Sequence, residues 1–97
     1  MGKQRRPQPK YLAKKLKKIR EELGIGQLEM AKRLSGIARP VDGAMVSRFE
    51  RGEREPSLLV IVAYCDIAQI NATVLIDDRW NVKDLVWAMP KKKVSSQ

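Results

Sequence analysis

The feature that most constrains the fold of this chain is a pair of short helical segments joined by a turn. Residues 27–34 place their apolar side chains on one face of a helix, and residues 35–41 hold the glycine and proline typical of a turn or short loop. Asp42 is then a good N-cap, because its carboxylate can accept hydrogen bonds from the unpaired amides of a first helical turn. A second helix follows at 43–51 and is closed by Gly52.

Further short helices are predicted on both sides of this pair. Apolar residues recur at helical spacing from Lys10 to Leu23, and Gly24 is a suitable residue to end that helix. Pro56 is expected in the first turn of a fourth helix, where its missing N–H costs no hydrogen bond. The apolar run at 58–65 would form the body of this helix.

The last third of the chain predicts two more short elements. Asn71 is expected to cap a fifth helix that continues through Ile76. Asn81, with Asp84 three residues later, predicts a final short helix through Met89, and a strand at 82–87 is the alternative. The predicted fold class is therefore all-α: a compact bundle of five short helices with a helix-turn-helix, plus a short C-terminal extension.

The formal charge of +9 over 97 residues is concentrated near the two ends of the sequence. The first twenty residues carry nine Lys and Arg and no acid, and three more lysines stand at 91–93. A basic arm and a basic first helix suit a polyanion, since each neutralised phosphate releases counterions, although such lysines can also serve solubility alone. The length allows one domain, which we divide into a flexible arm (1–9), a helical domain (10–78) and an extension with a basic tail (79–97).

The composition argues against several other classes of protein. Cys65 is the single cysteine and histidine is absent, so neither a disulfide nor a zinc site is expected, and Cys65 itself is expected to be buried. We find no constellation of catalytic residues and no glycine-rich phosphate loop, so neither an enzyme nor a cofactor is predicted. No signal peptide is recognisable, and the apolar run at 58–65 is too short to cross a bilayer. We therefore expect a cytoplasmic protein without a membrane partner.

The order and spacing of several residues resemble the Cro and lambda-repressor-like helix-turn-helix family (XRE-type). The resemblance extends over about Lys10 to Ile76, with a segment between the two paired helices that is several residues longer than the usual family turn. The matching residues are Arg20, Gln27, the run Ser47-Arg48-Phe49-Glu50-Arg51-Gly52, the run Arg54-Glu55-Pro56-Ser57, and Asn71. The family likeness implies that the second helix of the pair enters the major groove of double-stranded DNA.

The resemblance also implies which side chains meet the base edges. These are Gly43, Ala44, Ser47 and Arg48, on the outer face of the second paired helix. Arg48 is the long donor among them and can hold guanine O6 and N7 with two hydrogen bonds. Ser47 can bond to a base or a phosphate, Ala44 can touch a thymine methyl group, and Gly43 allows close approach. Family members usually present polar side chains where this helix begins with glycine and alanine.

Four residues are implied as phosphate contacts: Gln27, Arg39, Arg51 and Arg54. The alternative for the arginines is a solvated surface charge. Lys14, Lys15, Lys17 and Lys18 of the first helix would add non-specific attraction to DNA.

On the same resemblance, Glu50 points inward and pairs with Arg20, which would fix the second paired helix against the first helix of the chain. Two exposed side chains are the alternative, and an exposed pair would contribute little to stability.

Apolar residues are in excess after residue 58, which predicts a further contact surface. One interpretation is a homodimer interface that matches a palindromic DNA site. The other is that the C-terminal segment folds back on its own chain. The candidate interface residues are Leu59, Val62, Trp80, Leu85 and Trp87.

The sequence thus predicts a DNA-binding transcription regulator, a repressor that acts as a homodimer. The alternative is an antitoxin-like or accessory module that binds another protein through its C-terminal apolar surface, with secondary DNA binding.

Overall fold

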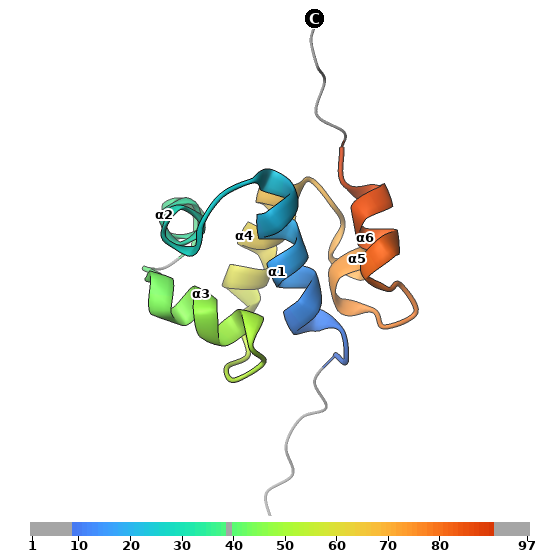
Figure 1. Cartoon of the computed structure of the whole chain (residues 1–97), viewed down its shortest axis with the longest axis horizontal. Helices are drawn as coiled ribbons and strands as arrows, with labels where there is room; N and C mark the ends of the chain where they lie inside the picture. Colours follow the sequence, from blue (N-terminus) through green and yellow to red (C-terminus); the bar gives the residue numbers. More distant parts are fainter. Residues whose placement is uncertain (1–8, 39, 91–97) are drawn as a thin grey trace, which may run out of the picture.

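The computed structural model describes residues 9–38 and 40–90 (Figure 1). These residues form six helices and no strand, so the predicted all-α class is confirmed. The helices are α1 (Leu12–Leu23), α2 (Gln27–Ile37), α3 (Gly43–Glu50), α4 (Leu58–Ala68), α5 (Ala72–Ile76) and α6 (Val82–Ala88). Within the described ranges, no helix is long and apolar enough to span a bilayer.

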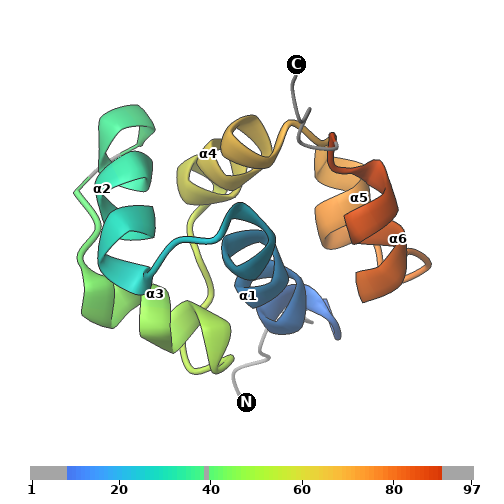
Figure 2. The ribbon, with the colours of Figure 1, turned by 45° about the horizontal axis from the view of Figure 1, so that its top comes forward.

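The first helix, α1, stands at the centre of the fold. Helices α2, α3 and α4 lie on one side of it, and α5 and α6 lie on the other (Figure 2). Side chains from all six helices meet in one core, because each helix turns an apolar face toward α1 or toward a neighbour that contacts α1. The largest fully buried apolar side chains are Leu16, Ile19, Met30, Leu34, Val46, Phe49, Tyr64, Leu75 and Leu85.

The predicted helix ends rest on local capping chemistry. Gly24 ends α1 in the left-handed conformation, with φ 69°. Asp42 caps α3, and its Oδ1 accepts a hydrogen bond from the Met45 N–H at 2.9 Å. Asn81 and Asp84 form a reciprocal capping box at the start of α6. This box decides between the two alternatives for the segment: it is a helix, and the strand is excluded.

Two predicted helix boundaries are wrong. The first paired helix does not stop at Leu34 but continues through Ile37, so the connection to α3 is shorter than expected. Ser35 lies within α2, and its side chain joins the two sides of this connection. Its hydroxyl accepts a hydrogen bond from the Val41 N–H at 2.9 Å and donates one to the Val41 carbonyl at 3.0 Å.

The start of α4 is the second boundary that differs from the prediction. Pro56 was expected in the first turn, but α4 begins at Leu58 and Ser57 is its N-cap. The Ser57 hydroxyl accepts a hydrogen bond from the Val60 N–H at 3.3 Å. Pro56 lies just before the cap and is buried.

Lys15 is not part of the basic surface that was predicted for α1. Its side chain is fully buried, and its Nζ donates hydrogen bonds to the carbonyls of Val74 at 2.8 Å and Asp77 at 3.1 Å. Burial lowers the pKa of Lys15, whereas the nearby carboxylates, Asp78 foremost, oppose that shift. Lys15 therefore satisfies carbonyls at the C-terminal end of α5 and joins that helix to α1.

The C-terminal segment folds back onto α1 and α5. Leu85 is fully buried and Met89 is buried with it, so the part of 79–90 that forms α6 shares the common core. Leu85 therefore cannot belong to an exposed interface, and this part of the predicted contact surface is wrong. Cys65 is buried as expected, and burial raises the pKa of its thiol.

Candidate nucleic-acid interface

Helix α3 has one buried face and one outer face. Val46 and Phe49 are buried in the core and fix the orientation of the helix. Ala44 and Arg48, four residues apart, are exposed on the opposite side, and Ser47 is partly exposed beside them. The structure therefore brings three of the four predicted base-contact residues, Ala44, Ser47 and Arg48, together on one outer face.

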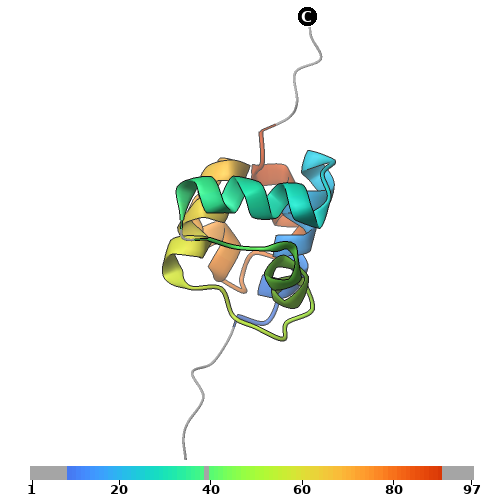
Figure 3. The same ribbon diagram turned by 90° about the vertical axis from the view of Figure 1, so that its left-hand side faces the viewer.

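The start of α3 lies close to the start of α2. A Cβ atom added to Gly43 would lie 3.9 Å from the Cα atom of Leu28, so Gly43 permits ordinary contact between the two helices. Figure 3 shows α3 passing across the first turns of α2. Leu28 itself is 66% exposed at this crossing.

The ion pair expected between Arg20 and Glu50 is present and largely shielded from solvent. Arg20 Nε donates to Glu50 Oε2 at 2.7 Å, and its terminal NH2 donates to Oε1 at 2.9 Å. The side chains are 15% and 3% exposed, respectively. The third nitrogen of Arg20 donates to the Ile25 carbonyl at 3.0 Å, and the hydrogen bonds that Arg20 donates to Glu50 raise the pKa of Arg20.

Gln27 takes part in the same network. Its Nε2 donates to Glu50 Oε1 at 3.2 Å, so α1, α2 and α3 all meet at one carboxylate. An amide nitrogen carries two hydrogens, and this bond uses one of them. Gln27 is partly exposed at the first turn of α2, beside the end of α3. The arrangement leaves Gln27 a second hydrogen for an anion next to that helix terminus.

Arg51, which was predicted as a phosphate contact, is engaged by neighbouring side chains. Its guanidinium donates to both carboxylate oxygens of Glu53, at 2.9 and 3.0 Å, and also to the hydroxyl of Ser47. The hydrogen bonds that connect Ser47, Arg51 and Glu53 were not predicted from the sequence. The spacing of Ser47 and Arg51 could have indicated one of them, because residues four apart on a helix are neighbours.

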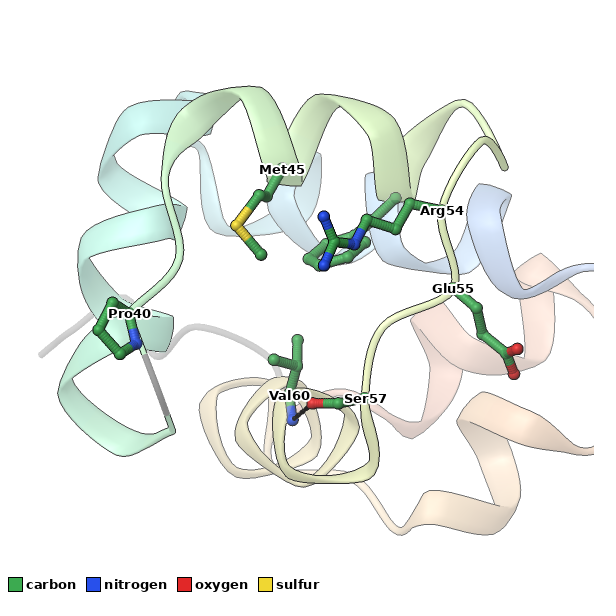
Figure 4. Close-up of a pocket in the computed structure, with 7 residues that line it drawn as sticks. Pro40, Met45, Arg54, Glu55, Ser57 and Val60 are labelled. Carbon is green, nitrogen blue, oxygen red and sulfur yellow. Dashed lines mark hydrogen bonds between the residues drawn. The ribbon is translucent and has the colours of Figure 1, made fainter.

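Arg54 lines a hollow of about 320 Å³ between α3 and α4. In Figure 4 its side chain extends from the connector toward Met45, while Val60 points up toward α3 from α4. Arg54 is exposed, so its guanidinium lies at the mouth of this hollow next to α3.

Lys17 is a further exposed cation that the structure places along α3. On α1, Ala13 lies 3.7 Å from the position of a Cβ atom added to Gly52, and Arg20 binds Glu50. Lys17 stands between these two contacts on the same helical ridge and is exposed. It therefore flanks the C-terminal end of α3, which the charge pattern alone did not distinguish from its neighbouring lysines.

The predicted contact Arg39 lies outside the described residues. The basic tail at 91–93 and most of the arm at 1–9 also lie outside them. Pro9, the first described residue, lines a small hollow together with Gly52 and Arg54. Among the residues that the structure describes, no group of acidic, cysteine or histidine side chains could hold a metal ion.

Comparison with known proteins adds two findings. A family model described as helix-turn-helix matches residues 16–75, more than half of the chain. Among solved structures, the P22 c2 repressor protein in complex with synthetic operator 9T, in the presence of Tl⁺, has a similar fold. The TM-score is 0.62, the sequence identity is 22%, and the match covers 71% of this chain and 97% of that one. None of the curated proteins matches the sequence.

Proposed function

This chain belongs to the helix-turn-helix family of DNA-binding regulators, and on that premise we propose that it is a sequence-specific repressor that reads the major groove with α3. The resemblance seen in the sequence is thereby confirmed at the level of family and fold. We further propose that it binds a specific operator, that it acts as a homodimer, and that individual residues have the roles described below. A regulator of this kind needs neither catalytic residues nor a cofactor, and we place it with DNA in the cytoplasm.

The observation that carries the proposal is the outer face of α3. Arg48 is exposed there, and its side chain forms no hydrogen bond or ion pair with another described residue. Val46 and Phe49 hold the opposite face in the core, so Arg48 is presented by a helix that is fixed in place. A guanidinium in this position can hold guanine O6 and N7 with two hydrogen bonds. Ala44, one turn earlier, suits a thymine methyl group.

Cations beside α3 support the same proposal. Lys17 lies along its C-terminal end and Arg54 lies at the mouth of the hollow behind it. We assign both to phosphates on either side of the groove, together with the amide of Gln27. Such contacts set the register of the protein on the duplex, whereas Arg48, Ala44 and Ser47 read the bases.

We predict that binding falls steeply as salt rises. If Lys17 and Arg54 each neutralise one phosphate, log K against log salt has a slope of about −2 per protomer. Titration of labelled duplex at several salt concentrations measures this slope, and selection from a random pool supplies the operator. A selected duplex that competes no better than bulk DNA would contradict sequence-specific binding.

Two apolar patches are exposed, and they differ in how they are placed relative to α3. On α4, Leu58 and Val62 are 76% and 55% exposed. Val60 between them points toward Met45 of α3 (Figure 4). Residues two apart on a helix differ by about 200° in direction, so Leu58 and Val62 face away from α3. Two protomers joined there would hold their α3 helices on opposite sides of the pair.

The second patch lies on α6 and the segment before it. Trp87 is 76% exposed and Trp80 is 41% exposed. Helix α1 separates α3 from α6 (Figure 2), so two protomers joined through α6 would stand side by side with α3 at the outer ends. Such a pair could reach two major-groove segments about 34 Å apart on one face of a palindromic operator. We therefore propose the α6 patch as the homodimer interface.

We expect Trp87→Ala to weaken self-association by at least about thirtyfold, since a buried tryptophan at the centre of an interface contributes about 2 kcal/mol or more. Sedimentation equilibrium of the whole protein measures the dissociation constant. Leu58→Ala is the matched control, because Leu58 is equally exposed but lies on the other patch. If Leu58→Ala separates the dimer and Trp87→Ala does not, the interface lies on α4. A protein that stays monomeric at high micromolar concentration contradicts the dimer.

The α4 patch favours a second candidate function. Leu58, Leu59 and Val62 form an exposed apolar stripe that the proposed dimer leaves uncovered. This stripe fits an accessory or antitoxin-like module that binds another protein and contacts DNA secondarily. The two candidates differ in DNA selectivity: the module would bind duplexes of all sequences with similar affinity.

A further inference from the structure

Three side chains at the C-terminal end of α3 form a chain that the proposed function leaves unexplained. Arg51 donates to both oxygens of Glu53 and to the hydroxyl of Ser47. The backbone N–H of Glu53 also donates to the Arg48 carbonyl at 2.9 Å. The backbone of Glu53 is thereby fixed at the last turn of the helix that carries Arg48.

A carboxylate is electrostatically unfavourable at this position. The C-terminal end of a helix is the negative end of its dipole, and the phosphates of a bound duplex would repel an acid beside α3. Glu53 nevertheless lies close to two arginines: the hydrogen bond from Arg51 lowers the pKa of Glu53, and the charge of Arg48 contributes. An acid that weakens attraction to all DNA is expected to have a compensating role.

The hydroxyl of Ser47 indicates that role. Because Arg51 donates to Ser47 Oγ, one lone pair of that oxygen is occupied and the hydroxyl hydrogen is left to another acceptor. Ser47 lies next to Arg48 and is partly exposed on the outer face of α3. It is thus prepared to donate a hydrogen bond to guanine O6 or N7, adenine N7 or thymine O4, and the amino group of cytosine is disfavoured.

We infer that Glu53 is a positioning residue for base recognition: it holds Arg51 against Ser47, so that Ser47 selects a hydrogen-bond acceptor on the edge of one operator base pair. The inference rests on the proposed role of α3 as the reading helix. Three of the five N–H groups of the guanidinium are used by Glu53 and Ser47. Glu53 offsets the charge of Arg51 and so limits its attraction to DNA of any sequence.

The experiment compares base preference and general affinity across variants of the whole protein. Binding is measured to the selected operator and to all its single-base-pair substitutions. Ser47→Ala identifies the position that Ser47 reads, where we expect a loss of about twofold to tenfold in discrimination, the value of one hydrogen bond. Glu53→Gln should lose discrimination at that same position and keep it at the position read by Arg48.

Glu53→Gln should also strengthen binding to random duplex, with a salt slope steeper by about 1 per protomer, because Arg51 is then released to a phosphate. Arg51→Lys, which cannot make the bidentate contact, should lose the same discrimination without that gain. Asp66→Asn is the charge-matched control. It removes an exposed acid of α4 that lies on neither the outer face of α3 nor the α6 patch, and it should leave every base preference unchanged.

Two results would overturn the inference. One is a Glu53→Gln protein that binds all duplexes more tightly by the same factor, which would make Glu53 a general repulsive charge. The other is a Glu53→Gln protein indistinguishable from Asp66→Asn. Failure of the proposed function looks different: Arg48→Ala would then leave all base preferences unchanged. Glu53 is 54% exposed, so these variants are expected to fold, and their circular dichroism spectra check this.

Discussion

Replacing Glu50 by alanine is expected to lower the free energy of unfolding by about 3–5 kcal/mol. The substitution leaves the guanidinium of Arg20 largely shielded from solvent without its anion, and it removes hydrogen bonds from Arg20 and Gln27. Because Glu50 joins α1 and α2 to α3, the loss falls on the contacts that orient the proposed reading helix. Urea unfolding at neutral pH, followed by circular dichroism, measures the change.

The pair formed by Glu29 and Arg33 on α2 is the matched control. Its side chains are 48% and 43% exposed, so Glu29→Ala should change stability by no more than about 1 kcal/mol. A joint replacement of Arg20 by Met and Glu50 by Leu should recover much of the loss, since both charges leave the interior together. If Glu50→Ala and Glu29→Ala are equally mild, the shielding of the Arg20–Glu50 pair has no energetic consequence.

Local chemistry explains why much of this fold could be predicted from the sequence. Gly24, Asp42 and the pair Asn81–Asp84 end or begin helices through bonds to backbone groups within a few residues. The family resemblance added the inward direction of Glu50, which periodicity alone did not give. The helix caps depend only on residues within a few positions of each helix end, so the local sequence is enough to predict them.

The errors arose where distant segments meet. Lys15 resembles its neighbouring lysines in sequence, but the C-terminal carbonyls of α5 lie across from it and accept its three-donor ammonium group. Leu85 was expected in an intermolecular surface because apolar residues are in excess after residue 58, whereas α6 packs back against α1. At the candidate site, the grouping of Ala44, Ser47 and Arg48 was implied by the family resemblance. The engagement of Arg51 by Glu53 did not, because it depends on how the chain turns after α3 ends.

Replacing Arg48 by alanine is expected to weaken binding to the selected operator by about 1–3 kcal/mol per protomer, the range for a bidentate arginine–guanine contact. This corresponds to a loss of about fivefold to 150-fold in affinity for each half-site. The loss should be concentrated at one base pair, since α3 presents Arg48 from a fixed backbone and the core residue Phe49 holds the adjacent turn. Fluorescence anisotropy with the operator and its single-base-pair variants measures both quantities.

Arg48→Lys separates the charge of Arg48 from its geometry. Lysine keeps the attraction to phosphates but lacks the planar pair of donors, so this variant should bind random duplex like the parent protein and still lose preference at the same base pair. Arg79→Ala is the control for charge, because Arg79 is 85% exposed on the connector between α5 and α6, paired with Asp77. If Arg79→Ala and Arg48→Ala weaken operator and random duplex by one common factor, Arg48 contributes only charge. The bases would then be read by residues other than Arg48.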